Sequence, residues 1–358
     1  MKFIVTGASG HLGANVVRAL IATGETVRAV DVRPGAALAG LDVEFMKGDV
    51  LEPAMLESAF VGADFVLHLA ARISTAGDPD GSVRRVNVDG VRNVAEAALR
   101  AGVRRVVHCS SLHAFDVGAT RGPVRENSPR ASAAALPAYD RSKAAGEDEL
   151  RRVIDRGLDA VIVNPSGIVG PVDPEPSRLG RVLLAMFRGR MPIAVRGAFD
   201  WVDVRDVSAA LLAAAERGRT GENYLLGGHR ASVAELGRVA AEVAGRRPPR
   251  VVAPLAPCVP SRRSACNWPA PAGPAVCCSR PNHCMRWPPI RSSITRRRSR
   301  NSAIAPARWK RRCATCTLRS SPRGDSRPGA ETRYRFESLA ASIVRSMCFA
   351  SGPPRYWP

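Results

Sequence analysis

Cysteine is almost absent from most of this chain: residues 1–256 contain only Cys109, whereas residues 257–358 contain eight. A single thiol is the usage expected of a domain kept in a reducing cytoplasm. Long apolar runs are also missing, and without 18 consecutive apolar residues we expect no membrane-spanning helix. The chain starts directly on Lys2-Phe3-Ile4-Val5, without the charged and then apolar pattern of a signal peptide. These absences predict a cytoplasmic protein with no membrane partner.

Acidic residues are scarce only near the C-terminus. Residues 1–256 hold 33 Lys+Arg against 29 Asp+Glu, and residues 257–358 hold 20 against 3. The formal net charge of +21 therefore lies mostly in the last hundred residues. Because the remainder of the chain is nearly balanced, its charge does not predict nucleic-acid binding.

The basic segment, residues 257–358, is rich in Arg, Pro, Ser and Cys, contains four of the five Trp, and lacks any sustained period of 2 or 3.6. Such a stretch does not bury enough apolar surface to offset its ordering entropy. A shifted reading frame in a GC-rich gene explains this mixture best; a disordered tail that touches nucleic acid is the second interpretation. A metal site is the third, since Cys313-x-x-Cys316 and His283-Cys284 supply ligand types, but no second well-spaced CxxC accompanies them. We assign no function and no metal to this segment.

Short β-branched runs alternate with helical patterns over the first 250 residues. Strands are expected at residues 3–5, 27–32, 65–69, 103–109 and 160–163, and helices at 12–21, 83–101, 138–154, 183–187, 207–215 and 233–243. Alternation of this kind predicts βαβ units, and therefore an α/β fold with a Rossmann-type doubly wound parallel sheet covered on both faces. The pattern loosens after Pro165, which predicts a small C-terminal lobe that closes over a ligand.

A glycine-rich loop joins the first expected strand to the first expected helix, reading Thr6-Gly-Ala-Ser-Gly-His-Leu-Gly13. Gly7 permits a tight turn, Gly10 lets the backbone approach a pyrophosphate, and Gly13 lets the helix pack closely on the strand. The free N–H groups of the helix start, including those of His11 and Leu12, then face the anion. The strand before the loop and the helix after it give this pattern its specificity for dinucleotide binding.

The cofactor type depends on the end of the second strand. Asp31 follows Gly13 by 18 residues, where a carboxylate accepts hydrogen bonds from the adenosine ribose. A carboxylate there repels a 2′-phosphate and favours NAD. Arg33, two residues further, offers a site for that phosphate, so NADP remains the alternative.

Tyr139 and Lys143 are four residues apart at the start of an expected helix, which places both side chains on one face. A free phenol has a pKa near 10, and we expect the Lys143 ammonium to lower that of Tyr139. Ser110-Ser111 closes the strand before this helix, at the carboxyl end where parallel sheets bind ligands. Tyr139 is predicted to exchange a proton with a substrate oxygen during hydride transfer.

Together the loop at 7–13, Asp31, Ser110-Ser111 and Tyr139-x-x-x-Lys143 resemble the short-chain dehydrogenase/reductase superfamily. The run Trp201-Val-Asp-Val-Arg-Asp-Val207 resembles a hallmark of its extended branch, the NAD-dependent epimerase/dehydratase family, over about residues 1–256. This resemblance implies an NAD(P)-binding domain with a catalytic trio at 1–165 and a substrate-binding lobe at 166–256. It implies that Ser111 is the catalytic serine, with Ser110 its neighbour near the cofactor.

The resemblance also implies further cofactor contacts. Asp49 and Val50 are expected at the adenine ring, the backbone of Leu69, Ala70 and Ala71 against the cofactor, and Asn164, Pro165 and Ser166 near the nicotinamide carboxamide and the substrate. Asn87 either approaches the nicotinamide end or caps a helix. His113 either lines the pocket or has a surface or capping role, which we favour.

The predicted function is hydride transfer between nicotinamide and a secondary alcohol or ketone of a small-molecule substrate. Residues 164–166 and the short stretch 172–198 look closer to dihydroflavonol-reductase-like members than to nucleotide-sugar epimerases or dehydratases, which remain the alternative. Dehydratases of the family carry an acidic pair near the serine, and Leu112-His113 occupies that place. An NAD(P)-binding protein with impaired catalysis is the alternative from another class. Relatives often dimerise through helices near 91–99 and 138–154, which leaves a homodimer open.

Overall fold

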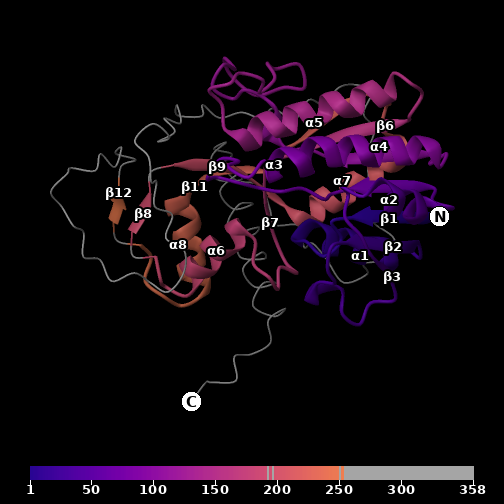
Figure 1. Ribbon diagram of the computed structural model, residues 1–358. Coiled ribbons are helices and arrows are strands. Elements are labelled where there is room, and N and C mark those ends of the chain that lie inside the picture. Colours follow the sequence, from indigo (N-terminus) through magenta and orange to yellow (C-terminus); the bar gives the residue numbers. More distant parts are fainter. Residues whose placement is uncertain (192, 196, 250, 254–358) are drawn as a thin grey trace, which may run out of the picture.

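A computed structural model describes residues 1–191, 193–195, 197–249 and 251–253. The basic segment that we interpret as frame-shifted, including its Cys and His residues, lies outside the described residues. Within the described ranges the chain forms a large parallel sheet with helices on both faces and a smaller group of elements beside it (Figure 1).

The main sheet has seven strands in the order β10-β6-β5-β4-β1-β2-β3, and every neighbouring pair is parallel. The strands are β1 Lys2–Thr6, β2 Thr26–Asp31, β3 Glu44–Lys47, β4 Phe65–His68, β5 Arg105–Cys109, β6 Ala160–Pro165 and β10 Asn223–Leu226. This order confirms the predicted Rossmann-type fold, with the chain reversing direction across the sheet between β1 and β4.

Alternation along each strand divides the core into two layers. In β1, Phe3 and Val5 belong to one buried cluster and Ile4 to the other. Phe65 and Leu67 of β4 follow the same rule, with their neighbour on the opposite face, because successive side chains point to opposite sides of a strand. Strands buried on both faces therefore appear as the nearly continuous apolar runs seen in the sequence.

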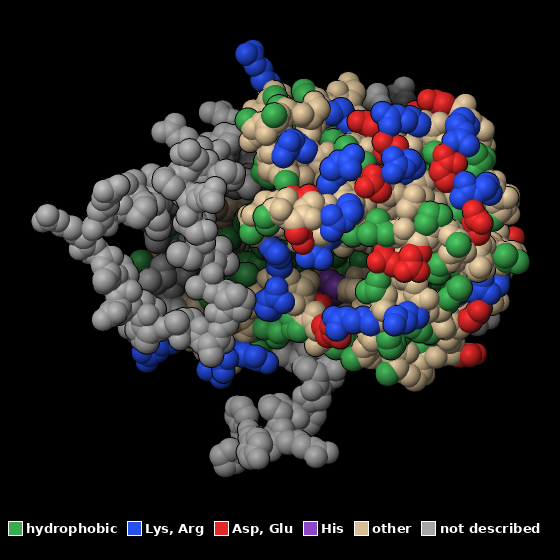
Figure 2. Space-filling view, viewed as in Figure 1, with side chains coloured by type: hydrophobic (Ala, Val, Ile, Leu, Met, Phe, Trp, Pro, Cys, Tyr) green, Lys and Arg blue, Asp and Glu red, His purple; other side chains and the backbone are tan. Residues whose placement is uncertain are grey.

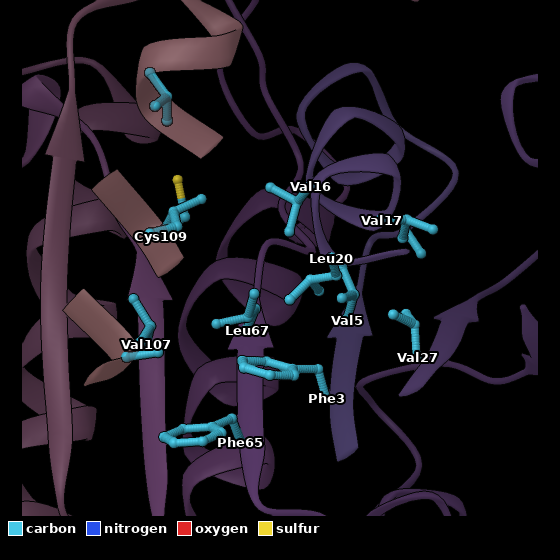
Figure 3. Packing of buried hydrophobic residues seen from close by; sticks show 14 of the residues in the cluster. Phe3, Val5, Val16, Val17, Leu20, Val27, Phe65, Leu67, Val107 and Cys109 are labelled. Carbon is cyan, nitrogen blue, oxygen red and sulfur yellow. The ribbon is translucent and has the colours of Figure 1, made fainter. Parts of the chain in front are cut away.

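Helices α1 (His11–Ala22) and α7 (Val204–Arg217) cover one face of the sheet. Figure 3 shows Val16, Val17 and Leu20 of α1 directed toward the strand side chains of this cluster. Helices α2 (Pro53–Phe60), α4 (Gly90–Arg100) and α5 (Ala138–Ile154) cover the other face. Each fully buried Leu, Val or Phe stabilises the fold by about 1.5–3 kcal/mol.

The helix expected at 83–101 is divided into three consecutive pieces. They are α3 (Ser82–Arg84), the π-helical turn η2 (Arg85–Asp89) and α4. The turn lies against Gly146 of α5, where a Cβ atom would sit only 2.2 Å from the carbonyl oxygen of Asn87. This close backbone approach accompanies the π turn, a feature that often occurs at functional sites.

The smaller group contains the strands β7 (Gly167–Val169), β9 (Ala198–Asp203) and β11 (His229–Ser232), and the pair β8 (Ile193–Val195) and β12 (Val251–Ala253). Helices α6 (Arg178–Phe187) and α8 (Val233–Val243) pack with Trp201 in a third cluster. Between β9 and β11 the chain returns to the main sheet to form α7 and β10. Residues 204–226, which we placed in the substrate lobe from the sequence, therefore pack on the main sheet.

The surface carries charges of both signs. On the face shown in Figure 2, Lys and Arg side chains are interspersed with Asp and Glu over the part that contains the main sheet. Among the described residues no helix is long and apolar enough to cross a membrane.

Candidate active site

A cavity of about 570 Å³ opens at the carboxyl ends of β1, β2 and β4. Ten of the residues that the sequence assigns to the cofactor line it: Gly7, Gly10, His11, Asp31, Arg33, Asp49, Val50, Leu69, Ala70 and Ala71. The predicted contacts Leu12 and Gly13 lie at the start of α1 behind this lining. The cavity therefore gathers the residues expected around the pyrophosphate, the adenosine ribose and the adenine.

The glycine loop has the tight geometry that a pyrophosphate site needs. Gly7 adopts φ +70°, where a Cβ atom would lie 2.7 Å from the amide nitrogen of Ala70. At Gly13 a Cβ atom would lie 2.2 Å from the carbonyl oxygen of Gly7. The first turn of α1 has no acidic residue and no side-chain cap at Gly10, so its N–H groups suit an anionic ligand. The loop thus fits the diphosphate of NAD(P).

The carboxylate of Asp31 is held in place at the opening of this cavity. Its two oxygens accept hydrogen bonds from the backbone N–H groups of Ser9, at 2.9 Å, and Val32, at 2.8 Å. Arg33 lies beside it and forms an ion pair with Glu175, with 2.7 Å between Nη2 and Oε2. Asp31 and Arg33, the two residues expected to decide the preference for NAD or NADP, therefore line the same cavity.

The predicted trio gathers where β5 ends and α5 begins. Ser111 is the second residue after β5, and its hydroxyl accepts a hydrogen bond from the backbone of His113 at 3.2 Å and hydrogen-bonds with Tyr139. Lys143, one turn further along α5, is buried and donates from Nζ to the carbonyl oxygen of Cys109 at 3.1 Å. The sheet order places this cluster on the strand next to β4, whose end lines the cavity.

The electrostatics of Tyr139 differ from the sequence expectation. Burial raises the pKa of the Tyr139 phenol above its ordinary value, and the hydrogen bond with Ser111 opposes that rise only in part. Lys143 does not produce the expected lowering, because its ammonium is directed to the Cys109 carbonyl, and burial also lowers the pKa of Lys143 itself. Tyr139 therefore holds its proton at neutral pH.

Glu147, one turn beyond Lys143 on α5, is a buried residue beside this trio that the sequence analysis missed. It is completely buried, and Oε1 accepts hydrogen bonds from Ser110 at 2.5 Å and Asn164 at 2.8 Å. Its Oε2 accepts from Asn223 at 2.9 Å and pairs with Arg130 at 2.7 Å and with Arg151 at 3.4 Å.

The network around Glu147 joins the ends of β5 and β6 to α5, because Asn164 also donates to the carbonyl oxygen of Ser111 at 2.9 Å. The sequence did contain one signal for it. Lys143, Glu147 and Leu150 follow the spacing of one helix face, so two charges lie on a stripe that is otherwise apolar.

Other predicted contacts are placed differently. The Asn87 side chain caps no helix; its amide pairs with both backbone groups of Arg72, at 2.8 and 2.9 Å, and donates to Ser142 at 2.9 Å. It thereby ties the loop after β4 to α5. Pro165 is buried, and Ser166 donates to Asp200 of β9 at 2.6 Å, so the end of β6 is anchored to the smaller group.

His113 lies next to the catalytic cluster. Its Nδ1 is 3.1 Å from a carboxylate oxygen of Asp140, and its ring meets the Tyr139 ring edge-on at 5.8 Å between centroids. The helix-capping group here is the hydroxyl of Ser111, not the imidazole.

Two further histidines, His68 and His108, stack between β4 and β5 with ring centroids 5.1 Å apart. Both are buried, and burial lowers the pKa of His68 to about 3 and that of His108 well below its ordinary value. The hydroxyl of Thr6 lies 2.8 Å from Nδ1 of His68. These imidazoles are therefore neutral parts of the core behind Lys143.

The described residues contain no group of three or more His, Cys, Asp or Glu side chains that could hold a metal ion. Sheet, glycine loop and cavity together define a dinucleotide-binding protein of the Rossmann type. The model of the NAD dependent epimerase/dehydratase family matches residues 3–227, and the chain belongs to this family. It is thus an NAD(P)-dependent enzyme of the extended short-chain dehydrogenase/reductase type, as the resemblance predicted.

Individual relatives agree with this assignment. The chain is 41% identical to sterol demethylase protein B of Methylococcus capsulatus over 256 residues, which cover 71% of this chain and 78% of that protein. It is 34% identical to a putative dihydroflavonol 4-reductase of Synechocystis, covering 71% and 75%. The crystal structure of gox2253 matches with a TM-score of 0.65 and 35% identity, covering 71% of this chain and 78% of that one. DesIV, a dTDP-glucose 4,6-dehydratase from Streptomyces venezuelae solved with NAD and TYD, matches with a TM-score of 0.62 and 26% identity, covering 71% and 85%.

Proposed function

We propose that this enzyme transfers a hydride between the nicotinamide of NAD and a secondary alcohol or ketone of a small-molecule substrate. The observation that carries the proposal is the gathering of Ser111, Tyr139 and Lys143 at the end of β5, on the strand adjacent to the cavity wall. The relatives named as a dihydroflavonol 4-reductase and a cinnamoyl-CoA reductase favour carbonyl reduction.

In this proposal the bound cofactor supplies the hydride, and the chain supplies the proton and the orientation. Tyr139 donates its proton to the substrate oxygen, and Ser111 holds that oxygen through its hydroxyl. Because burial raises the pKa of Tyr139, the phenol is protonated at neutral pH, which suits the reductive direction. Lys143 holds the ribose hydroxyls of the nicotinamide side, and residues 166–203 and 227–253 supply the substrate-binding lobe.

A nucleotide-sugar epimerase or dehydratase is the second candidate within the same class. Solved epimerases and dehydratases share the fold. The carboxylate pair that the family's dehydratases carry after the serine is replaced here by Leu112-His113, so we favour the reductase. Pairing of two copies through α4 and α5 belongs to the proposal as well, and light scattering of the full chain tests it.

The test is a cofactor titration followed by turnover. Full-length protein is titrated with NADH while the nicotinamide fluorescence is recorded. NADH oxidation is then followed with a panel of ketones, aldehydes and nucleotide-sugars. Saturable binding with turnover of a ketone supports the proposal. Binding without turnover of any class favours the catalytically impaired alternative, and a folded sample that binds neither NADH nor NADPH contradicts the whole proposal.

A further inference from the structure

A segment from outside the glycine-loop unit completes the adenosine end of the cavity. Asp173, Pro174, Glu175 and Ser177, which follow β7, line the same cavity as Asp31 and the glycine loop. The family resemblance assigned no role to them. This segment, residues 171–177, is called the strap below.

The strap is fixed to α1 at its first residue. The carbonyl oxygen of Pro171 accepts a hydrogen bond from Nδ2 of Asn15 at 3.0 Å and lies 3.1 Å from Nε2 of His11. The next residue, Val172, has φ +56°, a conformation that β-branched residues rarely adopt and that persists only where surrounding contacts impose it. The strap is thus held over the start of α1 at a cost in backbone strain.

The far end of the strap is closed by side chains. Asp173 accepts hydrogen bonds from the backbone and the hydroxyl of Ser177, at 2.9 and 2.8 Å, which makes a compact turn before α6. Between these residues, Glu175 reaches across the cavity opening to Arg33 at 2.7 Å. The strap therefore brings a second carboxylate to the edge of the adenosine site already occupied by Asp31.

The charges at this edge affect how well the 2′-phosphate of NADP can bind. A 2′-phosphate carries a charge between about −1.5 and −2 at neutral pH, and a guanidinium is its natural partner. Two arginines line the cavity, Arg33 and Arg72; Arg33 is the one two residues from Asp31, and its guanidinium is engaged by Glu175. The phosphate would have to displace one carboxylate from Arg33 while lying beside another, whereas a 2′-hydroxyl needs only an acceptor.

We propose that Glu175 is a specificity-determining residue that excludes the 2′-phosphate of NADP by neutralising Arg33 from across the cavity. The inference rests on the proposed nucleotide site and deepens it. Both partners are largely exposed, 72% for Arg33 and 55% for Glu175, so the pair is worth no more than about 1 kcal/mol. The expected change in affinity is correspondingly at most about fivefold.

The experiment compares dissociation constants of full-length protein for NADH and NADPH, measured by nicotinamide fluorescence at low and at physiological salt. The variants are Glu175→Gln, Arg33→Ala and their combination. The matched control is Glu57→Gln, whose pair with Arg100, at 3.0 Å, is similarly exposed but lies outside the cavity lining. Glu175→Gln is expected to tighten NADPH binding about threefold to fivefold and to leave NADH binding within twofold. The gain is expected to vanish in the double variant and to be smaller at physiological than at low salt.

Three outcomes overturn the inference: an unchanged NADPH constant in Glu175→Gln, an equal gain for both nucleotides, or a gain that persists without Arg33. In each of these the wild type still binds NADH, so the proposed function stands while the role of Glu175 falls. If the folded wild type binds neither nucleotide, the proposed function and this inference fall together. A gain of equal size in Glu57→Gln also counts against it, because the effect is then one of overall charge.

Discussion

The dinucleotide cavity and the proposed catalytic cluster lie at the same edge of one sheet. They differ in which parts of the chain form them, backbone groups in the first and side chains in the second. Backbone groups form much of the cavity wall, through the glycine loop and the short run Leu69-Ala70-Ala71. The cluster depends instead on buried side chains that meet at Glu147 from β5, β6, β10 and α5. A cavity lined by backbone needs small residues at fixed spacing, and such a pattern can be recognised in the sequence. A network of side chains joins segments that are distant in the sequence, so no local pattern predicts it.

The largest expected effect is a loss of turnover without a loss of cofactor binding. Tyr139→Phe removes the proposed proton donor and changes no residue of the cavity lining, so we expect kcat to fall about 10²- to 10⁴-fold. The dissociation constant for NADH should stay within twofold, as measured by fluorescence titration. The control is Tyr224→Phe on β10. It removes a phenol that accepts a hydrogen bond from the backbone N–H of Arg219 at 3.0 Å. Retained turnover in Tyr139→Phe would remove this residue from the mechanism.

The next effect concerns the stability of the cluster. Glu147→Gln replaces one acceptor oxygen of the buried network by an amide nitrogen that cannot accept a hydrogen bond, and each buried donor left without its partner costs about 1–3 kcal/mol. Urea unfolding measures this loss, and Glu242→Gln, which breaks a surface pair with Arg238, should cost at most about 1 kcal/mol. Equal small losses in both variants would show that the network does not support the cluster.

Acid should destabilise the core around His68 and His108, behind Lys143. Burial holds the pKa of His68 at about 3 against 6.5 in the unfolded chain, so the unfolded chain binds more protons between these values. The stability is complete above about pH 6.5 and is lost as the pH falls, by about 3 kcal/mol at pH 4.5 for this residue alone. Urea unfolding at pH 7.5, 5.5 and 4.5 measures the slope.

His108→Leu sharpens this test, because the pKa of His108 is lowered in the same direction and its two ring nitrogens have no hydrogen-bond partner among the described residues. The variant should lose less stability than the wild type on acidification. An unaltered slope in His108→Leu would mean that the imidazole is protonated in the folded state.

The smallest expected effect is confined to the cavity. Gly13→Ala places a methyl group where only 2.2 Å separates it from the Gly7 carbonyl oxygen, and such overpacking costs about 1–3 kcal/mol. We expect NADH to bind about 10- to 100-fold more weakly. Gly24→Asn, at a turn with φ +80° and open space around its Cβ position, should bind NADH normally. An unchanged affinity in Gly13→Ala would mean that the loop adapts and is not a rigid cradle.

The features that could be predicted from the sequence are those determined by residues close together in the chain. The short apolar runs of β1 and β4, the loop from Gly7 to Gly13 and the helix at 138–154 all depend on neighbours within a few residues. The four-residue spacing of Tyr139 and Lys143 is equally local: both lie on α5, where Tyr139 hydrogen-bonds with Ser111 and Lys143 with the Cys109 carbonyl oxygen.

The remainder depends on contacts that no local pattern contains. The pKa of Tyr139 is set by burial, so spacing alone predicted the wrong direction. Glu147 meets partners 17, 37 and 76 residues away in the chain. Glu175 is 142 residues from Arg33 and belongs to a segment that follows the sixth strand of the main sheet.

The return of the chain to the main sheet has a consequence for synthesis on the ribosome. β10 joins the edge of the sheet only after β7, β8 and β9 have been made, and it delivers Asn223 to the Glu147 carboxylate. A nascent chain that has released α5 but not residue 223 lacks one of the partners that Glu147 has in the folded protein. The hydrogen-bond network of Glu147 is therefore complete only once β10 has been synthesised, 76 residues after Glu147 itself.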